Sequence, residues 1–155
     1  MSYQRIKNLN YFDAENYRQL LARLDALTIN ATRQWGQMTA GQMLHHLNLA
    51  IGSGLGYYQL ADQSSFLSRN FIKILILNVL RKFPIATKTA KTLAVGDDFD
   101  FETEKQQLRE ILTKAYHTKT DSDWAKHTYF GKMSRQEWGK LIMIHCHHHF
   151  QQFSV

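Results

Sequence analysis

The chain has 155 residues, of which 44% are apolar and 21% charged, the composition of one globular domain over residues 1–155. The single cysteine, Cys146, excludes an internal disulfide framework. The N-terminus lacks the apolar core of a signal peptide, and the longest apolar run, residues 71–80, is too short and too polar to cross a bilayer. The sequence therefore predicts a cytoplasmic protein without a membrane span.

Helical periodicity marks four segments of the chain, and no segment alternates as a strand would. The first helix is expected to begin after Asp13, a residue type that caps helix N-termini, and to bury Leu20 and Leu24. The second is expected to begin near Thr39 and to weaken at the glycines from Gly52 onward.

A long crossover follows the second helix and is predicted to carry an extra apolar helix within residues 64–84, ended by Pro84. Because this helix is apolar on most sides, we expect it to pack on the bundle or on a second subunit of a homodimer. Residues 63–96 contain six basic residues and no acidic one, within a net charge of +6. A solvated face is the simplest interpretation of that charge, while an anionic ligand or a membrane surface is also open. Nucleic acid is not expected, because no binding motif accompanies the charge.

The third helix is expected after the acidic cluster at residues 97–104 and should bury Leu108 and Leu112. The fourth opens at Ser134 with the spacing of a capping box and should run to Gln152. Four amphipathic stripes predict an all-α protein: a four-helix bundle with a long crossover that carries an extra helix between helices 2 and 3.

The fourth helix contains four histidines within residues 145–149. At about 100° per residue, His145 and His149 share the apolar arc of the helix, whereas His147 lies nearly opposite and is expected to be exposed. In the second helix, His46 shares the apolar stripe. Three imidazoles that converge in a bundle interior are typical of a divalent metal site, with zinc or nickel as the metal that imidazole ligands favour.

Neighbouring residues leave parts of this site open. His45 and His148 each adjoin a predicted ligand, although His45 leans outward from the second helix. Cys146 is interpreted as a small buried apolar residue rather than a ligand. Gln152 could support a ligand or cap polar space at the end of the bundle. His127 could fold over the site, but a surface position in its loop is the simpler interpretation.

Two motifs resemble those of the DinB-like superfamily. The segment 35–47, WGQMTAGQMLHHL, resembles its second-helix motif, and the spacing of His145, His149 and Gln152 resembles its last-helix motif. Residues 127–138 are similar to one branch of that superfamily, catalogued as of unknown function. The resemblance covers most of the chain except residues 63–96, and it implies a four-helix bundle with a divalent metal held by His46, His145 and His149.

The characterised members of that superfamily include transferases that use bacillithiol or mycothiol and a thiol-dependent maleylpyruvate isomerase. The resemblance therefore implies a metal-dependent transferase that activates a low-molecular-weight thiol and transfers it to an electrophile. Basic residues such as Lys88 and Lys91 could then bind the carboxylates of the thiol. A metal-dependent hydrolase and a metal-stabilised binding or stress module without turnover are the alternatives, and whether the protein is an enzyme stays open. The sequence assigns no catalytic or thiol-binding residue.

Overall fold

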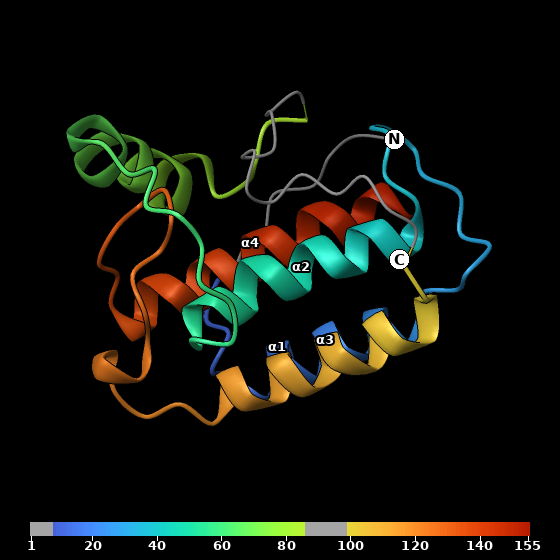
Figure 1. Cartoon of the computed structure of the whole chain (residues 1–155). Helices are drawn as coiled ribbons and strands as arrows, with labels where there is room; N and C mark the ends of the chain where they lie inside the picture. Colours follow the sequence, from blue (N-terminus) through green and yellow to red (C-terminus); the bar gives the residue numbers. More distant parts are fainter. Residues whose placement is uncertain (1–7, 86–98) are drawn as a thin grey trace.

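Four α-helices form the body of the molecule in the computed structural model, which describes residues 8–85 and 99–155 (Figure 1). Helices α2 and α4 lie side by side in one layer, and α1 and α3 form the other layer. Each helix contacts two others, one in its own layer and one in the facing layer, so the four enclose a common core. The bounds are Ala14–Ala26 for α1, Ala40–Gly54 for α2, Phe101–Tyr116 for α3 and Arg135–Gln152 for α4.

Each α-helix begins where a side chain accepts a hydrogen bond from the first helical turn. Capping boxes open α2 and α4, in which a glutamine or glutamate three residues on returns a hydrogen bond to the capping residue. These bonds satisfy N–H groups that have no partner within the helix. The predicted starts of α1, α2 and α4 are therefore confirmed. The prediction for α3 is wrong by a few residues: it begins at Phe101, inside the acidic cluster at residues 97–104 rather than after it, because Asp100 accepts a hydrogen bond from the Thr103 N–H and caps the helix there. The N-caps are Asp13, Thr39, Asp100 and Ser134.

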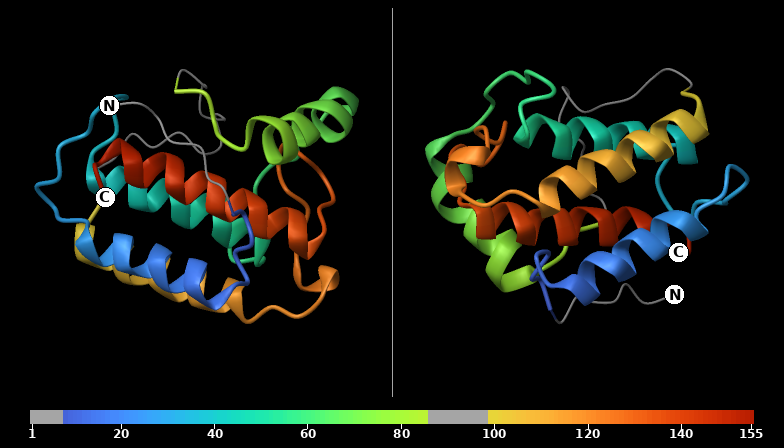
Figure 2. Two further views of the ribbon diagram at one scale, coloured as in Figure 1. Left: turned by 180° about the vertical axis from the view of Figure 1, so that it is seen from behind. Right: turned by 90° about the horizontal axis from the view of Figure 1, so that it is seen from below.

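The core is made of apolar side chains from all four helices, including Leu24, Leu44, Leu108 and Ile142, each 0% exposed. No β-strand occurs in the residues that the structure describes, where the single bridge joins His127 and Gly131. The all-α fold class and the long crossover between α2 and α3 are confirmed. Helix α4 is buried on nearly every side, because α1, α2 and the crossover all pack around it (Figure 2).

The crossover carries a helical stretch over residues 66–80, here called the crossover helix. It contains two π-helical segments, η1 at Ser68–Ile72 and η2 at Leu75–Leu80, whose hydrogen bonds span five residues. The helix ends at Leu80 rather than at Pro84 as predicted. The stop is made by Arg81, which adopts a left-handed conformation (φ 53°) and donates its N–H to the Ile76 carbonyl.

One side of the crossover helix packs on α4 through the buried side chains of Ile76 and Leu77. This confirms the prediction that the helix packs on the bundle, whereas a second subunit remains a prediction. Lys88 and Lys91, for which a role in thiol binding was predicted, lie outside the described residues. Within the described parts of the chain, no helix is long and apolar enough to cross a membrane.

Candidate metal centre

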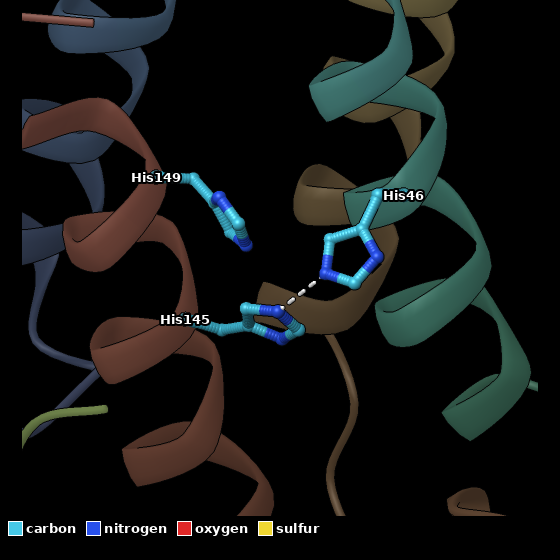
Figure 3. Close-up of side chains that lie close together, drawn as sticks. All are labelled: His46, His145 and His149. Atoms are coloured by element: carbon cyan, nitrogen blue, oxygen red, sulfur yellow. Dashed lines mark hydrogen bonds between the residues drawn. The ribbon is translucent and has the colours of Figure 1, made fainter. Parts of the chain in front are cut away.

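Three histidines from two helices face one another between α2 and α4 (Figure 3). His46 comes from α2, and His145 and His149 come from α4, where a spacing of four residues places them one turn apart. One ring nitrogen from each lies within 4.8 Å of the others. The structure thus brings together the three predicted ligands, here called the histidine cluster. The cluster could hold a metal ion.

The rings of the cluster meet at nitrogen atoms. The Nε2 atoms of His46 and His145 are 2.9 Å apart, so one of them carries a hydrogen and the other accepts it. The ring centroid of His46 lies 4.9 Å from that of His145 and 4.9 Å from that of His149. His46 and His149 are buried, whereas His145 is partly exposed.

The protonation of the cluster suits metal binding. Burial lowers the pKa of His145 and of His149 well below the usual value, and the neighbouring histidines, His46 first among them, lower it further. Neutral imidazole is the form that binds a metal, because its lone pair is free of a proton. Among the described residues, no carboxylate or thiol joins this group of three.

A chain of hydrogen bonds fixes the orientation of His149. The Gln152 amide nitrogen donates to the Trp35 carbonyl at 2.7 Å, which leaves the Gln152 Oε1 atom as an acceptor. His149 Nδ1 lies 2.9 Å from that oxygen and therefore carries the ring hydrogen, so its Nε2 presents a lone pair. The predicted supporting role of Gln152 fits this contact. The sequence did not indicate that the Trp35 carbonyl holds it.

Gly36 allows Gln152 to reach its position. The backbone of Gly36 has a φ of +76°, and a Cβ atom there would stand 2.5 Å from the Gln152 amide nitrogen. Any larger residue would be strained and would also displace the glutamine. The glycine after Trp35 is a sequence signal that could have pointed to this contact but was not interpreted in that way.

His45, the neighbour of His46, belongs to a different polar group. Its Nδ1 lies 3.0 Å from the carboxylate of Glu104 on α3, and its ring stacks on Phe99 at 3.8 Å. The Asn48 amide donates to the same carboxylate at 2.7 Å. His45 leans away from the cluster as predicted, but towards α3 rather than into solvent. The buried Glu104 was not singled out in the sequence, because a first-turn glutamate is normally exposed.

His147 points away from the cluster, but the prediction that it is exposed is wrong. It is partly buried, and Arg23 of α1 donates to its Nδ1 at 2.8 Å. The same guanidinium donates to the Val155 carbonyl at 2.6 Å. The physical reason is that α1 packs on the side of α4 opposite the cluster, a contact that the periodicity of α4 alone does not reveal.

His148 is buried beside the cluster without being part of the group of three. Its ring meets Trp35 and Phe83 edge-on, with centroids 5.9 and 6.1 Å away, and burial is the main cause that lowers its pKa to about 4. Phe83 also lies 5.2 Å from the His145 ring. Phe83 thus covers part of the site, although no periodic signal in the residues before Pro84 indicated it.

His127 does not join the histidine cluster, and its side chain is half-buried in the loop before α4. Its Nδ1 accepts hydrogen bonds from the backbone N–H groups of Tyr129 and Phe130, and its ring stacks on Phe130 and meets Trp138 edge-on. Burial lowers its pKa to about 4. The loop position agrees with the simpler of the two interpretations from the sequence, but neither interpretation included these contacts, which anchor the loop before α4.

Cys146 is fully buried, and burial raises the pKa of its thiol to about 12. It does not join the histidine cluster. The prediction that it is a buried apolar residue rather than a ligand fits this position.

The fold and the cluster define an all-helical bundle protein with a three-histidine site that could hold a metal ion. A family model described as "Protein of unknown function (DUF1569)" matches residues 3–155. The chain belongs to the DUF1569 family. In the two other comparisons, no curated protein and no solved structure matches the chain.

Proposed function

We propose that this protein binds one divalent metal ion through His46, His145 and His149 and is a transferase that activates a low-molecular-weight thiol. The observation that carries the proposal is the convergence of three ring nitrogens within 4.8 Å in a largely buried position. Burying three imidazoles in mutual contact costs free energy, which a shared cation would offset. The resemblance to the DinB-like superfamily supports the same assignment.

The donor set fits zinc or nickel. All three candidate ligands are imidazoles, whereas calcium and magnesium prefer oxygen. The orientation of His149 through Gln152 is the kind of outer contact that metal-binding histidines require. Three protein ligands are typical of a catalytic zinc site, while structural zinc sites have four. Cys146 and His127, the residues that could have supplied a fourth ligand, do not join the histidine cluster, and His127 accepts hydrogen bonds from its own loop.

A divalent cation held in this site would supply Lewis acidity, which lowers the pKa of a coordinated thiol or water. The protein itself contributes three imidazoles, of which His145 and His149 have a lowered pKa, a fixed tautomer at His149 and a partial cover of aromatic rings. Phe83 lies against His145 and His148, and Trp35 lies against His148. Such a cover would limit water at the site and strengthen electrostatic interactions there. An electrophile would approach from the partly exposed side of His145.

Cobalt substitution tests the proposal. When a small thiol is added to the cobalt-loaded protein, we expect a thiolate-to-cobalt charge-transfer band, and consumption of the thiol by a test electrophile should depend on the metal. Metal-dependent hydrolysis of an ester without any thiol would favour the hydrolase instead. A bound metal without a spectral response to thiols would favour the binding or stress module, and absence of metal would contradict all three.

A further inference from the structure

The crossover helix exposes several large apolar side chains, whereas Ile76 and Leu77 on its other side are buried against the bundle. The most exposed side chain is Phe66, at 76%, and its ring lies 6.2 Å from that of Phe71. Hydrogen bonds that span five residues widen this helix, so residues four or five apart share one side. We call this surface the outer face. It consists of Phe66, Phe71, Ile74, Leu75 and Val79, which are between 44% and 76% exposed.

A cationic pocket adjoins the outer face. It has a volume of about 420 Å³ and lies between the crossover helix and the loop before α4. Arg69 and Lys73 of the crossover helix line the pocket, and in the chain they alternate with Phe66, Phe71 and Ile74 of the outer face. The charged lining residues are four cations, Arg69, Lys73, Lys126 and Lys132, and one carboxylate, Asp62.

The pocket is held in shape by contacts between the helix and the loop. Ser68 Oγ donates to the Tyr129 carbonyl at 2.7 Å, and the ammonium of Lys73 lies 3.0 Å from Glu137. The side chain of Arg69 packs against Gly131, where a Cβ atom would stand 3.2 Å from its Cδ. These contacts join the crossover helix to the loop before α4, the two elements that provide the cationic side chains.

Apolar and cationic side chains in adjacent positions fit an anionic lipid surface. An interfacial helix inserts its apolar side at the boundary of head groups and acyl chains, while cations beside it attract anionic lipids. A second copy of the chain fits less well, because two-fold pairing of outer faces would bring the two pockets near each other, and each pocket has four cations against one carboxylate, Asp62. Nucleic acid would match the charge but leave Ile74, Leu75 and Val79 in water.

We infer that the crossover helix docks the protein on an anionic phospholipid membrane, with the outer face in the interface and the cationic pocket around a lipid phosphate. The helix lies parallel to the surface in this arrangement. This docking does not depend on metal binding by the histidine cluster.

Sedimentation of the full chain with vesicles tests this inference. We expect binding to phosphatidylcholine vesicles that contain phosphatidylglycerol, weakening as salt is added, and little binding to phosphatidylcholine alone. Replacing Phe71 and Leu75 together by serine should weaken binding about tenfold or more, because two large apolar side chains no longer enter the interface. The matched control is Ile29→Ser, since Ile29 is 67% exposed in the loop after α1. Circular dichroism checks that each variant is folded.

A pair of charge reversals tests the pocket. Arg69→Glu with Lys132→Glu should abolish binding to the anionic vesicles. Arg18→Glu with Lys114→Glu changes the net charge equally on α1 and α3, in the other layer of the bundle, and should reduce binding much less. Equal loss in both pairs would overturn the inference, as would absence of vesicle binding by the wild type. The inference would also be overturned if the wild type were a dimer and the Phe71 and Leu75 variant a monomer. Binding of inorganic phosphate or nucleic acid without any binding of vesicles would overturn it as well.

Discussion

Between α2 and α4, polar rings lie among buried apolar side chains, whereas on the outer face of the crossover helix apolar side chains lie in solvent. His46 is 3% exposed and Phe66 is 76% exposed, the reverse of what their side chains prefer. Both arrangements cost free energy in the isolated chain. The difference teaches that one molecule can carry two candidate sites of opposite chemistry, one proposed here for a cation and one for a lipid surface.

The largest expected effect comes from removing a ring of the histidine cluster. His46→Ala, His145→Ala and His149→Ala should each reduce the metal content from about one ion per chain to near zero, because two imidazoles are too few to hold it. Elemental analysis of untagged protein measures this. His147→Ala is the control, since that ring contacts Arg23 instead, and it should keep the metal. Loss of metal in the control with retention in the other three would contradict the assignment.

A smaller effect is expected from Gln152. Gln152→Ala should weaken metal affinity by about 10- to 100-fold, because His149 loses the acceptor that fixes its tautomer. Competition with a chelator of known affinity measures the change. Gln151→Ala provides an adjacent comparison on the same helix turn, with no contact to His149 in the hydrogen bonds of the described residues. Equal weakening in both variants would indicate a general loosening of the end of α4.

Acidification should weaken metal binding gradually. Protons compete with the metal for imidazole, so the apparent affinity falls as the pH decreases. Since burial and neighbouring histidines lower the pKa of His145 and His149, the fall should lie below the value of about 6.5 typical of free histidine. Isothermal titration at several pH values measures it. An affinity unchanged down to pH 4 would exclude an all-histidine site.

The metal-free protein should also lose stability in acid. His127 and His148 each have a pKa of about 4 when folded, against 6.5 when unfolded. Between these values the unfolded chain binds more protons, so the free energy of unfolding is greatest above about pH 6.5 and decreases towards pH 4. Urea unfolding at several pH values tests this. In His127→Gln the decrease should be shallower, and an unchanged profile would show that His127 does not contribute.

The smallest effect is expected when one of the two regions is changed and binding at the other is measured. Phe71→Ser should leave the metal content unchanged, because distant and independent sites add without coupling. Conversely, removal of the metal should leave vesicle binding within about twofold of its original value. A larger change would show that the two regions communicate, and Phe83, which follows the crossover helix and contacts His145, would be the residue to test next.

The starts of α1, α2 and α4 and the histidine cluster could be predicted because they depend on local rules. A capping residue and a spacing of four residues act within one helix. The cap at Ser134 and the pair of His145 and His149 could therefore be predicted without knowing which helices pack on α4. The choice of His46 over His45 needed only the apolar stripe of α2.

Other features depend on which elements pack together, and no local pattern in the sequence indicates that packing. His147 is partly buried because α1 happens to cover its side of α4. Glu104 is buried because His45 and Asn48 approach it from another helix. The crossover helix ends before Pro84 because Arg81 adopts a left-handed conformation, which no residue preference for arginine indicates.

The fully buried thiol of Cys146 provides a chemical probe of local unfolding around α4. With a pKa of about 12 and no exposed surface, the thiol in the folded protein is nearly inert towards alkylating reagents and disulfides at neutral pH. Labelling therefore reports the population in which α4 has separated from its neighbours. A protein that handled thiols and electrophiles would for the same reason be protected from modifying itself.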